Sequence, residues 1–234
     1  MFISRVSLVE TDGALGVLAK LLGRRTDAYA RHELIWSLFA GTEAAPRDFL
    51  YREIAGRRPT WLIVSARAPA DTLGLWRIDS KPFAPAIARG QRLGFALRAN
   101  PTVSRSKPVG GQAAGRHDVV MAAMKRDGVS RDEAVATAGR AWLQRQGLRA
   151  GFEVEPKGLR IGGYMRHQFE RPGGKPMVLA SLDFEGVLTV TDPDAFVRTL
   201  AAGLGRGKAF GFGLLLVRKA GRTAPIGAAL DTDE

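Results

Sequence analysis

The stretch Gly203-Leu-Gly-Arg-Gly-Lys-Ala-Phe-Gly-Phe-Gly213 lies near the C-terminus and continues directly into Leu214-Leu-Leu-Val217. Glycine is costly inside a helix or strand because it loses much conformational freedom on folding and has no side chain to pack. We therefore expect a loop between a helix and a strand, in which the backbone closely approaches another group or offers successive N–H groups to an anion. A tight connection that binds nothing is the structural alternative.

The charges inside this glycine loop, residues 203–213, favour a phosphate partner. Arg206 and Lys208 supply positive charge, while Gly205 and Gly207 leave the backbone beside them open. We predict that these four residues contact the backbone of a nucleic acid.

Two known glycine motifs do not fit the loop. A P-loop requires a glycine where Ala202 stands and a hydroxyl residue where Ala209 follows Lys208. A dinucleotide-binding fingerprint would need its third glycine at Phe210 and should follow a strand. Neither nucleotide-binding class is supported.

Composition also indicates a polyanionic partner. The chain has 234 residues and a formal net charge of +12, and a globular protein this basic usually binds a polyanion. An arginine-rich genome or general solubility is the alternative explanation. The absence of cysteine removes disulfides, thiol nucleophiles and nearly all structural zinc sites. No long apolar run or signal-peptide pattern is present, so we expect a cytoplasmic protein without membrane contact.

Periodicity in the N-terminal half predicts the order strand, helix, strand, strand, helix, strand. The first strand alternates apolar and polar residues, and Thr26 is a plausible N-cap for the first helix. A turn-prone segment separates the second and third strands. The expected elements are strands at 2–8, 49–54, 61–65 and 77–83 and helices at 27–39 and 70–76.

The C-terminal half repeats that order. Gly147 is predicted to stop the first helix, and Asp192-Pro193 has the residues of an N-cap and a first helical position. Residues 102–131, basic and rich in glycine, are interpreted mostly as a mobile insertion, and residues 220–234 as a disordered tail. The expected elements are strands at 91–98, 159–169, 177–190 and 214–217 and helices at 131–146 and 192–200.

The fold class is therefore predicted as α+β, with two tandem ferredoxin-like βαββαβ domains. The first would cover residues 1–88 and carry the catalytic helix. The second would cover 89–219, with the insertion, a basic hairpin at 159–178 and the glycine loop. Such paired sheets suit RNA, because sheets present flat surfaces and hairpins enter grooves.

Tyr29 and His32 are the candidates for acid–base chemistry. They lie three residues apart on the first predicted helix and would be neighbours on its surface. Histidine can transfer protons near neutral pH. A partly buried aromatic cluster without catalytic function is the alternative.

Other chemistry has less support. His117 falls in the charged insertion, and His167 lies on a predicted strand, where it contacts RNA or is merely exposed. No set of histidines and carboxylates has metal-ligand spacing, so we predict no metal site and no cofactor. A serine nucleophile elbow is absent.

The hairpin at 159–178 carries a surplus of positive charge. It can lie along an RNA stem and contact phosphates, with one arginine reaching a guanine edge. A solvated edge hairpin whose charges prevent aggregation is the alternative. The candidate RNA-binding residues are Arg171, Arg166, Lys175 and Arg160.

Across residues 1–218 the chain resembles the CasE-type CRISPR-associated endoribonucleases of the RAMP superfamily. The resemblance is carried by Phe2-Ile-Ser-Arg-Val-Ser-Leu8, Tyr29-x-x-His32, Arg47-Asp-Phe-Leu50, Arg92-Leu-x-Phe-x-Leu-Arg-Ala-Asn-Pro101, Ala141-Trp-Leu-Gln-Arg145, Leu182-x-Phe-Glu-Gly-x-Leu-x-Val-x-Asp-Pro193 and the glycine loop.

This resemblance implies an RRM-like double fold that cuts CRISPR precursor RNA at repeat stem-loops, without metal, and stays with the product in the type I-E Cascade complex. The upstream 2′-hydroxyl would attack the phosphate and leave a 2′,3′-cyclic phosphate. The family's catalytic histidine and tyrosine fall on His32 and Tyr29, and Arg171 is the foremost hairpin candidate. The implied partners are repeat RNA and the other Cascade subunits.

Two other classes of function stay open on the sequence. One is an RNA-binding subunit of the same fold that does not cleave, in which His32 is structural. The other is a basic nucleotide-dependent enzyme that uses the glycine loop, which the absent P-loop residues disfavour.

Overall fold

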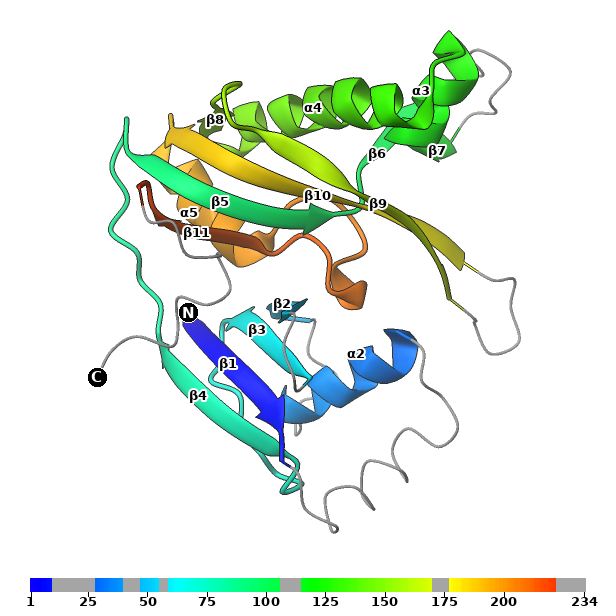
Figure 1. Ribbon diagram of the computed structural model, residues 1–234. Coiled ribbons are helices and arrows are strands. Elements are labelled where there is room, and N and C mark those ends of the chain that lie inside the picture. Colours follow the sequence, from blue (N-terminus) through cyan, green and yellow to red (C-terminus); the bar gives the residue numbers. More distant parts are fainter. Residues whose placement is uncertain (10–27, 40–46, 55–58, 106–114, 170–176, 222–234) are drawn as a thin grey trace.

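The computed structural model describes the chain except residues 10–27, 40–46, 55–58, 106–114, 170–176 and 222–234. Two antiparallel sheets lie one above the other in Figure 1, and the longest helix, α4, covers the outer face of the C-terminal sheet. No helix in these described ranges is long and apolar enough to cross a membrane.

The N-terminal sheet has the strand order β2-β3-β1-β4. Its elements in chain order are β1 (Phe2–Leu8), α2 (Ala28–Trp36), the short 3₁₀ helix η1 (Ser37–Phe39), β2 (Phe49–Ile54), β3 (Thr60–Ser65) and β4 (Trp76–Pro82). Strand β3 is buried along its whole length. Trp61 and Ile63 share a core with α2, whereas Leu62 and Val64 face the C-terminal half. The alternation of a strand's side chains thus divides β3 between two cores.

The predicted helix at 70–76 is wrong, because this segment is an irregular loop leading into β4. The Asp71 carboxylate accepts hydrogen bonds from the backbone N–H groups of Leu75 and Trp76, at 3.1 and 3.0 Å. An aspartate that captures backbone donors in this way competes with helix formation. The described N-terminal half therefore has one helix where the sequence predicted two.

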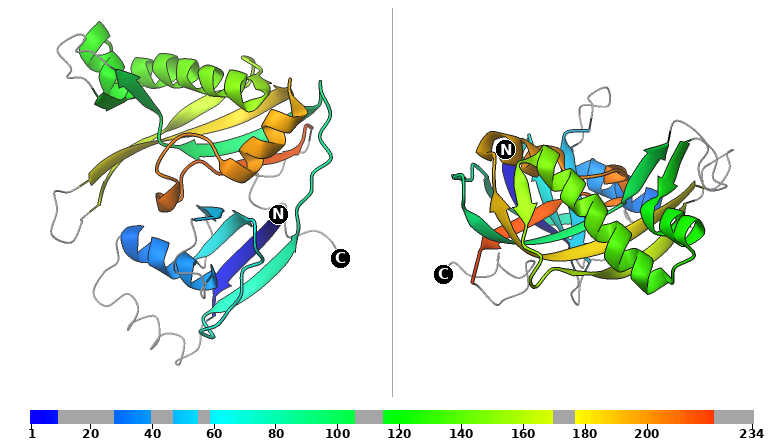
Figure 2. Two further views of the ribbon diagram at one scale, coloured as in Figure 1. Left: turned by 180° about the vertical axis from the view of Figure 1, so that it is seen from behind. Right: turned by 90° about the horizontal axis from the view of Figure 1, so that it is seen from above.

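The C-terminal sheet has the strand order β11-β5-β10-β8, and β9 also pairs with β10. Its main elements are β5 (Arg92–Ala99), α4 (Arg131–Ala150), β8 (Phe152–Val154), β9 (Arg160–Phe169), β10 (Met177–Val190), α5 (Pro193–Ala202) and β11 (Leu215–Lys219). Asp192 caps α5 through its side chain, with Pro193 at the first position as predicted. Figure 2 shows β9 and β10 running together as a long hairpin.

Gly147 does not stop α4, which ends instead at Gly151 in the left-handed conformation. A Cβ at Gly147 would lie 2.6 Å from the Phe152 carbonyl oxygen. The missing side chain therefore allows the helix to pack closely on β8. Gly147 was predicted to end the helix, but its role is to permit this close packing.

The described parts of the insertion at 102–131 form mostly regular secondary structure. The prediction that most of this segment is mobile is therefore wrong for these residues. The insertion forms β6 (Thr102–Arg105), β7 (Gly115–Asp118) and the helix α3 (Val119–Asp127). Val120 and Ala123 join the C-terminal core, and the Asp118 carboxylate accepts a 2.5 Å hydrogen bond from the Tyr164 hydroxyl. The apolar side of α3 thus attaches the insertion to the domain; residues 106–114 lie outside the described residues.

A third buried cluster joins the two halves. Leu50, Leu62 and Val64 from the N-terminal sheet pack against Leu214 and Leu216. The apolar run that follows the glycine loop is therefore both strand β11 and part of this interface. The loop itself is placed between the two sheets as a result.

Candidate nucleic-acid interface

All five glycines of the loop have positive φ angles. Gly211, at φ 80°, leaves room for Tyr51, whose ring would lie 3.1 Å from a Cβ there. The loop is closed by backbone hydrogen bonds from Leu204 to Gly213 and from Gly213 to Arg98, at 2.9 and 2.7 Å. The glycines are thus required by the backbone conformation and close packing of the loop. This agrees with the alternative that the loop is a tight connection between a helix and a strand. The expected nucleic-acid role of the loop stays a prediction.

The loop contains the short 3₁₀ helix η2 (Lys208–Phe210), which packs against α2 beside His32. The half-buried His32 forms a hydrogen bond with the backbone of Ala209. Its ring lies 5.7 Å from that of Trp36 and 6.4 Å from that of Phe49, centroid to centroid. The packing of the two halves therefore brings the predicted catalytic histidine to the glycine loop.

The pKa of His32 is lowered from 6.5, first by burial and then by the positive charge of Arg47, against the hydrogen bond to Ala209. Its Nδ1 is buried and has no hydrogen-bond partner in the described part of the chain. A protonated ring would have to donate from both nitrogens, so this environment favours the neutral imidazole. Neutral histidine can accept a proton at physiological pH.

Arg47 and Lys208 complete a cationic cluster beside His32. Burial lowers the pKa of Lys208, and the charge of Arg47 lowers it further. Burial also lowers the pKa of Arg47, whose Nε is buried without a partner among the described residues. Two crowded, partly desolvated cations attract an anion, and both line a cavity of about 400 Å³. Sequence reasoning named Arg47 only within a family motif and missed it as a site residue.

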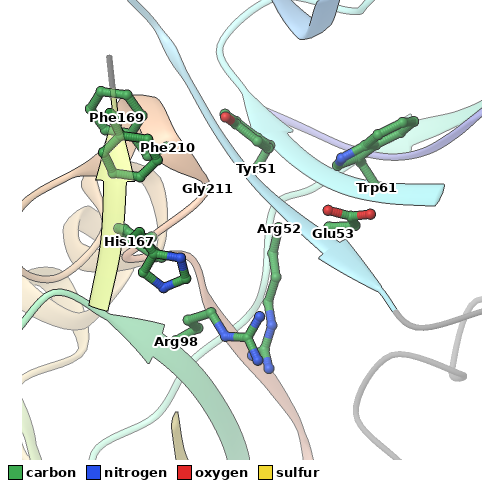
Figure 3. Close-up of a pocket in the computed structure, with 10 residues that line it drawn as sticks. Tyr51, Arg52, Glu53, Trp61, Arg98, His167, Phe169, Phe210 and Gly211 are labelled. Atoms are coloured by element: carbon green, nitrogen blue, oxygen red, sulfur yellow. The ribbon is translucent and has the colours of Figure 1, made fainter. Parts of the chain in front are cut away.

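Tyr51 fixes the other side of this turn. Its hydroxyl donates a 2.9 Å hydrogen bond to the Ala209 carbonyl oxygen, the backbone segment that His32 also contacts. Figure 3 shows Tyr51 on strand β2, pointing toward Gly211 and Phe210 of the loop. Residues 158 positions apart thus hold the loop against the histidine.

The remaining predicted catalytic residue is Tyr29. It lies on α2 one turn before His32, as expected, but its side chain lies outside the described residues. Its role stays a prediction.

The hairpin candidates are dispersed. Arg171 and Lys175 lie outside the described residues. Arg160 is largely exposed, with its guanidinium 3.7 Å from Glu185. The exposed Arg166 lies near Tyr164. Burial and then Asp118 raise the pKa of this tyrosine, and the charge of Arg166 acts against the rise. Neither arginine is brought to the cluster of His32, Arg47 and Lys208 by any contact in the described chain.

The loop candidates differ in exposure. Arg206 is exposed and forms an isolated β-bridge with Asn100, while Lys208 is half-buried. A Cβ at Gly205 would lie 3.1 Å from the Trp142 ring, and one at Gly207 would lie 2.8 Å from that of Phe212. These two glycines are therefore needed for packing.

His167 lies against the glycine loop, where the sequence left contact with RNA or simple exposure open. Its Nε2 lies 2.9 Å from the Ser181 hydroxyl oxygen, and its ring lies 5.3 Å from that of Phe212. Within the described ranges, no three His, Asp or Glu side chains gather as a metal-binding group.

Comparison with known proteins agrees with this arrangement. A family model described as "CRISPR associated protein" matches residues 1–219. The chain belongs to this family. It is 30% identical over 210 residues to the CRISPR-associated endoribonuclease Cse3 of Thermus thermophilus, covering 86% of each chain. It is 29% identical over 197 residues to the Cascade subunit CasE of Escherichia coli, covering 81% of this chain and 90% of that one.

Solved structures of relatives share the fold. Cse3 bound to a 19-nucleotide RNA superposes with a TM-score of 0.66 at 26% identity, over 93% of this chain and 98% of that one. Thermus thermophilus Cse3 bound to an RNA representing a pre-cleavage complex gives a TM-score of 0.65, with the same identity and coverage. The recognition of a CasE-type protein from the sequence is therefore confirmed.

Proposed function

We propose that this family member is an endoribonuclease that cuts CRISPR precursor RNA at its repeat stem-loops. The observation that carries the proposal is the half-buried, neutral His32 held beside Arg47 and Lys208 at the glycine loop. A proton acceptor next to two cations suits cleavage at a phosphodiester. The relatives named as CRISPR endoribonucleases or bound to RNA support the same class.

The reaction we propose begins at the 2′-hydroxyl upstream of the cut. The imidazole of His32 accepts its proton while the 2′ oxygen bonds to phosphorus, and the bond from phosphorus to the 5′ oxygen breaks. The departing 5′ oxygen takes up a proton and becomes a hydroxyl, which leaves a 2′,3′-cyclic phosphate. Arg47 and Lys208 stabilise the negative charge that develops on the phosphate oxygens. Tyr29 orients the histidine or the phosphate, and no metal is required.

The decisive experiment incubates the purified chain with the repeat RNA of its own host under single-turnover conditions. The wild type should cleave in excess EDTA, and a 2′-deoxy substitution at the nucleotide upstream of the cut should abolish cleavage. His32→Ala should lower the rate by roughly 10²–10⁴-fold while RNA affinity is retained; Tyr29→Phe should be milder. Cleavage by His32→Ala at the wild-type rate, or activity that returns only with Mg²⁺, would contradict the mechanism.

The packing of His32 favours a second candidate function. Its ring lies among Trp36 and Phe49, and its Nδ1 is buried, as expected of a structural histidine in a subunit that binds RNA without cutting it. Cleavage of the repeat by the wild-type chain would exclude this candidate.

We further propose that the product remains bound and that the protein acts in the cytoplasm as a Cascade subunit. The similar CasE of Escherichia coli is named as a Cascade subunit. Residues 1–88 and 89–219 would be two ferredoxin-like domains. The strand order β2-β3-β1-β4, and the order β11-β5-β10 with β9 paired to β10, support this division, although the described part of the first domain lacks the second helix.

A further inference from the structure

A second pocket lies beside the glycine loop, at the free edge of strand β2. It has a volume of about 100 Å³, room for several water molecules or one flat ring system. Side chains from both faces of β2 line it, together with β9 and the end of the glycine loop (Figure 3). The proposed cleavage chemistry makes no use of this pocket.

One wall of the pocket is aromatic. The rings of Phe169 and Phe210 stack with centroids 4.4 Å apart and planes 18° apart. The ring of His167 is stacked on Phe169, with centroids 6.1 Å apart and planes 6° apart. Phe169 is buried, whereas Phe210 is partly exposed. The ring of Phe210, backed by Phe169, therefore provides a flat platform on which an unpaired base stacks.

The opposite wall offers hydrogen-bond donors that nothing in the described chain satisfies. Nη1 of Arg52 and Nε1 of Trp61 are both buried without a partner. A buried donor left unpaired is costly, and two in one pocket indicate a ligand with acceptor atoms. The oxygens and ring nitrogens of a nucleobase are such acceptors.

The neighbouring charges hold these donors in place. Arg98 makes two hydrogen bonds to Asp183, at 2.8 and 2.7 Å, and is thereby neutralised. Arg52 reaches the same carboxylate only at 3.9 Å. Arg52 therefore keeps hydrogen-bonding capacity for another group, including its buried Nη1. Glu53 also lines the pocket, which favours the uncharged base of a nucleotide over its phosphate.

The pocket and the catalytic cluster share one short turn. Lys208 lines the cavity that contains Arg47, whereas Phe210, two residues later, lines this pocket. Tyr51 connects the two sides, because it lines the pocket and donates to Ala209 beside His32. An RNA strand whose phosphate lies at Lys208 thus has a neighbouring nucleotide within reach of Phe210.

We propose that this pocket binds the base of one unpaired nucleotide adjacent to the scissile phosphate, stacked on Phe210 and hydrogen-bonded by Arg52 and Trp61. The inference rests on the proposed function and adds a subsite to it. Binding of that base places the cleaved bond at His32 and contributes to the choice of cut position.

The test uses repeat RNA made uncleavable by a 2′-deoxy nucleotide at the cut. Single abasic nucleotides are introduced in turn through the unpaired positions flanking the stem, and affinity is measured by equilibrium titration. For the wild type, one position should stand out, with roughly tenfold weaker binding when its base is missing. Phe210→Ala should weaken binding of intact RNA by a similar factor, and the abasic change at that position should then have no further effect.

Trp61→Phe keeps an aromatic ring at this buried position but removes the indole N–H donor. It should therefore weaken binding through the same position by a smaller factor. Leu148→Ala and Arg92→Gln, which alter exposed side chains away from the pocket, are the controls and should bind like the wild type. Melting temperatures verify folding. An abasic penalty equal in wild type and Phe210→Ala at every position would overturn the proposal and indicate a water-filled gap.

Cleavage of unmodified repeat RNA by the wild type is measured in parallel. If the wild type cuts while no base is coupled to Phe210, the subsite fails and the endoribonuclease stands. If the wild type binds but does not cut, the proposed function fails, and the abasic scan still reports independently on the pocket.

Discussion

At the scale of single residues, the state of His32 is set by its surroundings. Burial and Arg47 both lower its pKa, so the ring is neutral above 6.5 and begins to take up a proton only at lower pH. Protonation would occur in the unfolded chain before the folded one, so the contribution of His32 to stability is lost as pH falls below 6.5. The same shift favours the neutral form that the proposed role of His32 as proton acceptor requires.

The pH dependence of cleavage should reveal this shift. The rate at subsaturating enzyme reports the free protein, so its acid limb should lie below pH 6.5, the ordinary histidine value. Arg47→Gln removes the lowering charge, and the acid limb should move upward as the rate falls. Arg92→Gln, at a remote ion pair with Glu155, should leave the limb in place. An acid limb that does not move in Arg47→Gln would contradict the electrostatic coupling.

At the scale of elements, the glycine loop has both a structural and a chemical side. Its glycines occupy positive φ angles, and several lie where a Cβ would collide with a neighbour. Lys208 instead contributes a partly desolvated charge, which we expect to matter more for RNA binding than for folding. Substitutions can therefore separate folding from RNA binding.

Lys208→Ala should lower RNA affinity and reduce the salt slope of binding by about one unit, with an almost unchanged melting temperature. Gly205→Val should damage both properties, because Gly205 has φ 75° and Trp142 lies 3.1 Å from the position of its Cβ. Titrations at several salt concentrations, with thermal melts, provide the measurement. If Lys208→Ala leaves both the RNA affinity and the salt slope of binding unchanged, the loop only connects α5 to β11 and does not bind RNA through Lys208.

At the scale of the whole molecule, the site exists only where the two halves meet. His32 and Arg47 come from the N-terminal half and Lys208 from the C-terminal half, and the buried cluster at the interface sets their relative position. Leu50 lies at this interface, with its side chain 2.9 Å from where a Cβ of Gly203 would be. Packing between the halves should therefore control catalysis.

Leu50→Ala should cost about 2–5 kcal/mol of unfolding free energy, the usual range for a buried leucine. It should also slow cleavage at temperatures where the protein is folded, because the loop is no longer held at α2. Leu188→Ala, a fully buried position in the C-terminal core, should destabilise comparably and cut normally. Urea unfolding and single-turnover rates test this pair. Equal rates in both variants would mean that the interface does not position the site.

Much of the fold could be predicted because its signals are local. Alternation predicted β1 and β5, and the apolar run after the glycine loop predicted β11. Caps predicted α5, and turn residues predicted the hairpin of β9 and β10. The errors arose where a nearby group overrode the local signal. Asp71 captured the donors of the expected helix at 70–76, and Gly147 served packing on Phe152.

For the site, the sequence by itself determined the parts: one histidine on a helix, a basic glycine loop and a polyanionic partner. It did not reveal that Arg47 lies beside His32 or that Phe210 and Trp61 share a pocket. Those relations depend on tertiary packing, since Tyr51 and Ala209 are 158 residues apart and meet only when the two sheets do. The pattern within a segment indicates which face of a helix or strand is buried. The residue that packs against this face from a distant segment depends on how the whole core packs, so only the tertiary structure decided these contacts.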